Sequence, residues 1–119
     1  PVLIAAARQD WPDATWLVGD LAELALTDRF DAVVCAGNVM AFAAPGTRVE
    51  ILRRMRAHLA ADGRAVIGFG AGRGYPFDRF LADADAAGLV PEVLFATWDL
   101  RPFTDGADFL VASLRGRDR

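Results

Sequence analysis

Short apolar runs of strand length alternate with amphipathic helical segments along this chain, and this alternation constrains the fold most. The apolar runs predict strands at residues 15–18, 31–37, 65–69, 93–97 and 109–113. Helical patterns cover residues 1–8, the stretch from Thr47 to Gly63, and residues 77–87, with a single turn or loop at 21–26. Such alternation is typical of an α/β fold with a mostly parallel sheet and helices on both faces. The strands at 93–97 and 109–113 follow each other without a helix, so we expect the last strand to run antiparallel.

Local signals refine three of these elements. The run at 31–37 is continuously apolar, as expected for a strand buried on both faces. Thr47 and Glu50 have the spacing of a capping box, and Gly63 is the expected left-handed cap that ends this helix. Residues 115–119 are polar and are expected to form a disordered tail, which leaves residues 1–114 as one folded unit.

Composition excludes several classes of protein. The chain has 119 residues, enough for one domain, and its hydrophobic fraction of 54% is too high for intrinsic disorder. No apolar run is long enough to span a membrane. The 13 basic and 16 acidic residues give a net charge of -3, so nucleic acid is not an expected partner. A single cysteine excludes an intrachain disulfide and a zinc cluster, so we expect no metal and a cytoplasmic location.

Polar residues at the ends of two expected strands are the candidate ligand contacts. Asp20 follows the strand at 15–18, where its carboxylate can accept hydrogen bonds from a ligand or simply cap a helix. Gly37 and Asn38 follow the strand at 31–37, where they either let a ligand approach the backbone or form a turn. In parallel sheets ligands bind at the carboxyl ends of the strands, so we expect these residues to open onto one cleft.

Other features are weaker candidates. The glycine-rich stretch at residues 68–74 is similar to a nucleotide-binding loop, but its spacing departs from the strict pattern and Pro76 delays the following helix. His58, the only histidine, is expected on the surface near a helix C-terminus. Cys35 is expected to be an inert core residue, and no catalytic set of serine or cysteine with histidine can be assembled. The catalytic residues therefore stay unknown.

Taken in order, these segments resemble class I S-adenosylmethionine-dependent methyltransferases. Residues 19–21 are similar to the motif after the family's third strand, and residues 30–38 to its fourth-strand motif. Residues 59–66 resemble the turn into the fifth strand, and residues 98–103 the connection before the last strand. The resemblance implies S-adenosylmethionine as cofactor, with the adenine at Asp20 and Leu21 and the methionine part at Ala36, Gly37 and Asn38. It also implies a three-layer Rossmann-like sheet.

The sequence departs from the family at its beginning. The glycine-rich first motif and the ribose-binding acid have no counterpart upstream of Asp20. We therefore interpret the chain as the C-terminal part of the domain, without the first two strands, and expect it to be inactive alone. The expected activity of the whole domain is methyl transfer to a small-molecule acceptor of unknown identity. The alternatives are a non-catalytic binding or association fragment, and a nicotinamide-dependent oxidoreductase that uses residues 68–74.

Loss of those strands has a consequence for association. In the family's strand order, 3-2-1-4-5-7-6, the strand at 31–37 would lose its neighbour on one edge. An apolar strand with a free edge recruits another chain. We therefore expect self-association through residues 31–37.

Overall fold

The chain folds around one four-stranded sheet with the strand order β1-β2-β4-β3. The structure is a computed structural model, and it describes residues 2–117. Its helices are α1 (Val2–Asp10), α2 (Val39–Phe42), α3 (Arg48–Ala57) and α4 (Phe77–Ala86), with 3-10 turns η1 (Leu21–Glu23) and η2 (Pro45–Thr47). Its strands are β1 (Phe30–Cys35), β2 (Leu59–Gly70), β3 (Leu89–Phe95) and β4 (Phe109–Gly116).

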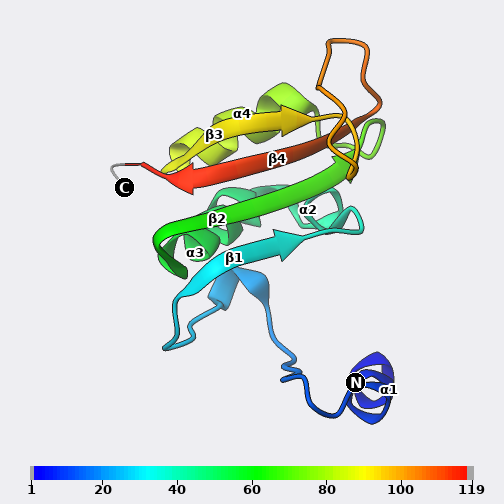
Figure 1. Cartoon of the computed structure of the whole chain (residues 1–119), viewed down its shortest axis with the longest axis vertical. Coiled ribbons are helices and arrows are strands. Elements are labelled where there is room, and N and C mark those ends of the chain that lie inside the picture. Colours follow the sequence, from blue (N-terminus) through cyan, green and yellow to red (C-terminus); the bar gives the residue numbers. More distant parts are fainter. Residues whose placement is uncertain (1, 118–119) are drawn as a thin grey trace.

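Strand directions agree with the expected fold class. β1 pairs with β2 in parallel, while β4 pairs antiparallel with both β2 and β3. Three strands therefore point the same way and only the last, β4, runs against them (Figure 1). The predictions of an α/β fold, a mostly parallel sheet and an antiparallel last strand are confirmed.

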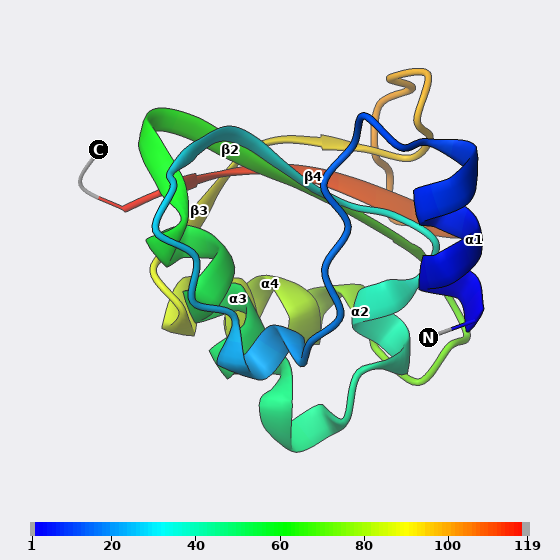
Figure 2. The same cartoon turned by 90° about the horizontal axis from the view of Figure 1, so that it is seen from below.

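The helices that pack on the sheet lie on a single face. Figure 2 shows α2, α3 and α4 below the sheet, while α1 lies beside it and not over either face. The connection from β1 to β2 and the connection from β2 to β3 step across the sheet in the same direction. Right-handed crossovers that step in one direction place their helices on one face. The expectation of helices on both faces is therefore wrong for the part of the chain described here.

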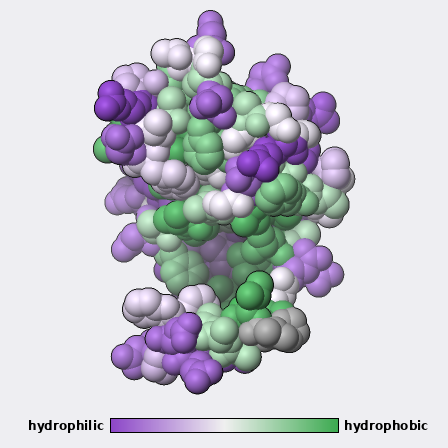
Figure 3. All heavy atoms as spheres, turned by 90° about the vertical axis from the view of Figure 1, so that its right-hand side faces the viewer, coloured by the Kyte–Doolittle hydropathy of each residue, from purple (hydrophilic) through white to green (hydrophobic). Residues whose placement is uncertain are grey.

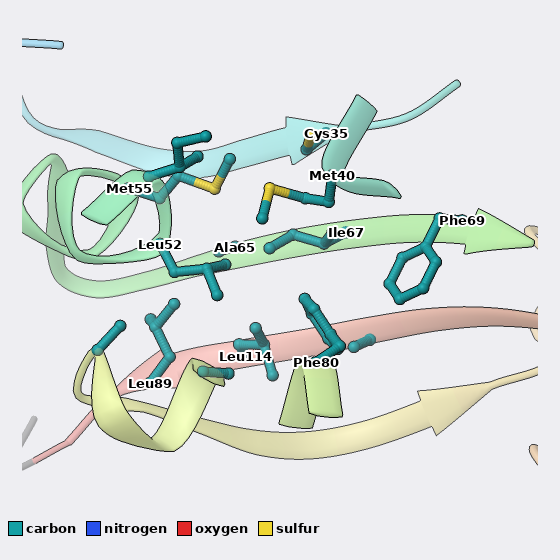
Figure 4. Packing of buried hydrophobic residues seen from close by; sticks show 14 of the residues in the cluster. Cys35, Met40, Leu52, Met55, Ala65, Ile67, Phe69, Phe80, Leu89 and Leu114 are labelled. Carbon is teal, nitrogen blue, oxygen red and sulfur yellow. The ribbon is translucent and has the colours of Figure 1, made fainter. Parts of the chain in front are cut away.

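The hydrophobic core fills the space between this sheet face and its helices. Ile67 and Phe69 of β2 are fully buried, and they meet Leu52 of α3 and Phe80 of α4 (Figure 4). Side chains alternate along a strand, so the residues between them point to the opposite face. The packed face is what fixes the register of β2, because a slip of one residue would turn its apolar set outward.

Two expected strands differ from the prediction. Residues 15–18 form no strand, and Leu17 and Val18 are 61% and 63% exposed. No described segment pairs with them, and extended backbone without a partner gains no ladder of hydrogen bonds. β1 is a strand but is not buried on both faces: Val34 is 63% exposed and only Cys35 is buried. The reason is that β1 is an edge strand whose outer face carries no helix.

Helix α3 begins and ends differently from the prediction. Thr47 makes no side-chain cap; its Oγ1 donates to the carbonyl of Ala44 at 2.7 Å, because Thr47 already has helical angles as the last residue of η2. Glu50 pairs instead with Arg53, at 3.2 Å. The helix ends at Ala57, and Gly63 lies inside β2. A Cβ on Gly63 would lie 2.7 Å from the carbonyl oxygen of Phe30, so close strand approach, and not a left-handed cap, explains this glycine.

The expected disordered tail is partly ordered. Arg115 and Gly116 are the last residues of β4, and the N–H of Arg117 donates to the carbonyl of Gly88 at 2.8 Å. The strand continues because Arg115 and Gly116 lie opposite Val90 and Leu89 of β3, which begins four residues before the predicted strand. Residues 118 and 119 lie outside the described residues.

His58 is buried, contrary to the surface position expected for it. Only 4% of the residue is exposed. Its Nε2 accepts a hydrogen bond from the N–H of Leu26 at 2.8 Å, and its Nδ1 lies 2.7 Å from the carbonyl oxygen of Arg54. The acceptor role of Nε2 assigns the proton to Nδ1, which donates to that carbonyl. The ring therefore ties the loop before β1 to the end of α3.

We expect His58→Ala to destabilise the fold. The substitution leaves the Leu26 N–H and the Arg54 carbonyl without their partner, and each buried unpaired group costs roughly 1–3 kcal/mol. Urea unfolding followed by circular dichroism should show a loss of about 2–4 kcal/mol. The matched control is Arg53→Ala on the same helix, where an exposed ion pair contributes about 0–1 kcal/mol. Equal losses in the two variants would contradict the role assigned to the ring.

Candidate functional site

The carboxyl ends of β1 and β2 are joined by the side chain of Asn38. Gly37 and Asn38 follow β1 with φ values of 72° and 64°, so two successive residues adopt the left-handed conformation. This turn aims the Asn38 side chain at the neighbouring strand, where its Oδ1 accepts a hydrogen bond from the N–H of Gly70 at 2.7 Å. The turn proposed as an alternative for these two residues is thus present. The amide oxygen of Asn38 is engaged by the protein itself.

Asp20 caps the 3-10 turn η1. Its Oδ1 accepts a hydrogen bond from the N–H of Ala22 at 2.9 Å. This is the capping role that the sequence offers for Asp20 beside ligand binding. Its other carboxylate oxygen has no hydrogen-bond partner within residues 2–117. The cap leaves this second oxygen free to accept, so capping and ligand binding are compatible at this position.

One groove brings the Asp20 turn together with the segment after Asn38. It has a volume of about 450 Å³. The lining residues come from two separated stretches: Gly19, Asp20, Leu21, Val39, Phe42, Ala43, Ala44, Thr47 and Ile51. Phe42 is 67% exposed and Val39 41%, so the groove offers apolar surface beside a carboxylate.

The groove contains only some of the residues expected to share one cleft. Asp20 and Leu21 share it with Val39, the residue after Asn38, but Ala36, Gly37 and Asn38 do not line it. Figure 3 views the molecule from the carboxyl ends of β1 and β2 and shows a hollow with hydrophobic surface around it. Val39 and Phe42 were missed as candidates from the sequence, although four apolar residues directly after Asn38 were a usable signal.

The first half of the glycine-rich stretch is strand and not loop. Gly68, Phe69 and Gly70 are the last residues of β2, and Phe69 is fully buried. A Cβ on Gly68 would lie 2.5 Å from the indole of Trp98, so this glycine is covered by a side chain. Gly68 therefore serves the packing of the strand, while Gly72 and Gly74 lie in the loop after it with left-handed φ values of 75° and 84°. Nothing in this arrangement supports a nicotinamide site.

Other reactive groups are sparse among the described residues. Cys35 is buried in the core, as expected, and burial raises the pKa of its thiol, which disfavours a reactive thiolate. Residues 2–117 contain no group of three or more histidine, cysteine or acidic side chains arranged to hold a metal ion. None of the helices in this part of the chain has the length and apolar character needed to cross a membrane.

Comparisons with known proteins identify the fold. No family model and no curated protein matches the sequence. Among solved structures, a TehB-like S-adenosylmethionine-dependent methyltransferase from Corynebacterium glutamicum is 49% identical over 98% of this chain, with a TM-score of 0.94. The chain spans 64% of that protein's length.

More distant structures share the architecture. An S-adenosylmethionine-dependent methyltransferase from Clostridium acetobutylicum matches 98% of this chain and 72% of its own, with a TM-score of 0.88 at 7% identity. The glycopeptide N-methyltransferase MtfA in complex with S-adenosylmethionine matches 95% of this chain and 68% of its own, with a TM-score of 0.76 at 13% identity. At such low identities these two show the fold alone. The resemblance of the sequence to class I S-adenosylmethionine-dependent methyltransferases is therefore confirmed, and the chain has the fold of that family.

Proposed function

We propose that this chain binds S-adenosylmethionine and takes part in methyl transfer to a small-molecule acceptor. The observation that carries the proposal is the groove that joins Asp20 and Leu21 to the segment after β1. Val39 follows the turn at the carboxyl end of β1, and ligands of α/β folds bind at the carboxyl ends of the strands. The Corynebacterium relative, described as S-adenosylmethionine-dependent, supports the choice of cofactor.

The adenine end of the cofactor fits the Asp20 side of the groove. The free carboxylate oxygen of Asp20 can accept a hydrogen bond from an exocyclic amino group. Leu21, Val39 and Phe42 supply apolar surface against which a flat ring can pack. The carboxylate thus suits the amino group of a purine, and the exposed apolar side chains beside it suit the ring.

The methionine end fits the turn at residues 36–38. Gly37 has a left-handed φ of 72°, and open space surrounds the position that a Cβ would occupy. A ligand can therefore approach this backbone closely, which a side chain at this position would prevent. The bond from Asn38 to Gly70 holds the turn in place, so we assign Asn38 an orienting role as well as a contact role.

Methyl transfer requires little chemistry from the protein. When bound, S-adenosylmethionine supplies the methyl group, which an acceptor nucleophile takes by in-line displacement. The residues of this chain contribute by holding the reactants close and aligned, an effect that can lower the barrier by about 7–11 kcal/mol. We propose that residues 41–45 and 98–108, which follow β1 and β3, form part of the acceptor site.

The proposal is tested by amide chemical shifts in 15N-labelled protein titrated with S-adenosylmethionine. We expect shifts confined to residues 19–21 and 36–42, and affinity weaker than micromolar, because the sequence contains no ribose-binding acid before Asp20. Each missing charge-assisted hydrogen bond costs about 1.5–3 kcal/mol. Asp20→Asn should weaken binding by roughly tenfold, since its neutral oxygen is a poorer acceptor.

Glu23→Gln is the matched control, since Glu23 is another acid of the same turn and lines a neighbouring cavity without Val39. Equal effects of the two variants would contradict the assignment of Asp20. Shifts at residues 68–74 on addition of NADH, with none at residues 19–21 on addition of S-adenosylmethionine, would overturn the proposed cofactor.

We also propose that the chain associates with itself through β1. One edge of β1 pairs with β2, and no described residue pairs with its other edge. Its exposed side chains include Phe30, Ala32 and Val34, with Asp31 as the single charge. An edge with so little protection favours pairing with a second copy of the same strand.

Sedimentation at micromolar concentration should therefore show a dimer. Val34→Lys should shift it to monomer, because a charge on the edge strand opposes pairing. Val93→Lys is the control, since Val93 is a comparably exposed valine on β3, the strand at the opposite edge. A wild-type monomer, or dissociation caused equally by both variants, would rule out association through β1.

A further inference from the structure

A second cavity lies on the helical side of the molecule, between the start of α3 and the start of α4. Its volume is about 640 Å³. It is separated from the groove described above by turn η2: Thr47 faces the groove, while Pro45 and Arg48 face this cavity. The proposed cofactor site does not use any residue that lines it.

Arg48 is the unusual residue of this cavity, because its guanidinium is buried with an unused donor. Only 7% of the residue is exposed, and its guanidinium carbon lies 3.8 Å from the centre of the Tyr75 ring. Its Nη2 donates to the carbonyl of Ala41 at 2.9 Å, while its buried Nε has no acceptor within the described residues. Buried charged donors almost always have a partner, so this nitrogen indicates a missing acceptor.

One carboxylate in the lining of this cavity is already engaged. Asp83 lines the same cavity, and its Oδ2 accepts a hydrogen bond from the Tyr75 hydroxyl at 2.6 Å. Burial, together with this bond to Asp83, raises the pKa of Tyr75 well above its usual value, so the hydroxyl keeps the proton that it donates. Oδ1 of Asp83 lies 3.4 Å from Nε of Arg79. Asp83 therefore has two partners, and Arg48 is not one of them.

The charges around the cavity limit what can bind there. Arg48 and Arg79 contribute two positive charges, and Asp78 and Asp83 contribute two negative charges. The balanced lining disfavours a dianion such as phosphate, because Asp78 and Asp83 would repel the second charge. A single planar carboxylate meets the geometry of guanidinium donors without that cost.

We propose that this cavity binds a small molecule through one carboxylate group, held by Arg48 and Arg79. The carboxylate supplies the acceptor that Nε of the Arg48 guanidinium lacks. Proline, valine and alanine side chains form the remaining wall and suit a short apolar body on the ligand. The Tyr75 ring behind the guanidinium keeps its charge in place while the carboxylate binds.

The experiment follows the arginine Nε–H signals of the 15N-labelled 119-residue chain. Butyrate, inorganic phosphate and chloride are added separately at matched ionic strength. Butyrate should shift the Arg48 signal saturably and the Arg79 signal with it, while the signal of the exposed Arg53 stays in place. An equal shift with chloride, or tighter binding of phosphate than of butyrate, would overturn the proposal.

Two variants separate binding from folding. Arg48→Lys keeps a cation over Tyr75 but removes the planar donor pair, and it should weaken butyrate binding by roughly tenfold or more. Arg79→Gln changes a side chain that is 72% exposed, so folding should be retained while the affinity falls several-fold. Arg53→Gln is the control on α3 and should bind as the wild type does. Unchanged affinity in Arg79→Gln, or equal losses in all three variants, would contradict the site.

Discussion

β2 pairs along both of its edges, with β1 on one side and β4 on the other, and the rest of the described structure depends on that double pairing. α3 leads into this strand and α4 follows it, so its position also places the two longest helices of the packed face. At its start, His58 ties the end of α3 to the loop before β1; at its finish, Gly70 receives the side chain of Asn38. Contacts at both ends of β2 therefore depend on its register with β1. At the carboxyl end of β2, the bond from the Gly70 N–H to Asn38 also holds the turn that precedes Val39, one of the residues that line the groove.

Sequence periodicity predicted the elements whose environment is local. Helix α4 was anticipated within one residue of its end, because its amphipathic pattern and the stop at Gly88 lie within the segment itself. The exposure of β1 could not be predicted in this way. An apolar run indicates that a strand can be buried, but it does not show whether another element covers it. The position of His58 was missed for the same reason. One partner, Arg54, lies on the preceding helical turn, but the other, Leu26, lies on a loop 32 residues away. No local sequence pattern predicts a contact with Leu26.

The candidate site divides along similar lines. Asp20, Gly37 and Asn38 were identified because polar and glycine residues at strand ends are visible in the sequence, and the fold does bring the Asp20 turn beside the segment after β1. The engagement of the Asn38 oxygen could not be anticipated, since it depends on the register between β1 and β2. Arg48 could not be identified as a binding residue from the sequence. All 13 basic residues are arginine, so nothing in the sequence separates Arg48 from the others. Its burial, its unpartnered Nε and its packing against Tyr75 distinguish it from the other arginines of the described residues.

Gly68 and Trp98 form a pair matched in size, one with no side chain and the other with the largest. The indole occupies the space where a side chain at position 68 would lie. The connection that carries Trp98 is braced internally, since the N–H of Ala96 donates to the carbonyl of Arg101 and Thr97 accepts from the Arg101 N–H. A larger residue at position 68 therefore needs this space to be vacated, either by a smaller side chain at position 98 or by rotation of the indole, which is 44% exposed, away from the strand.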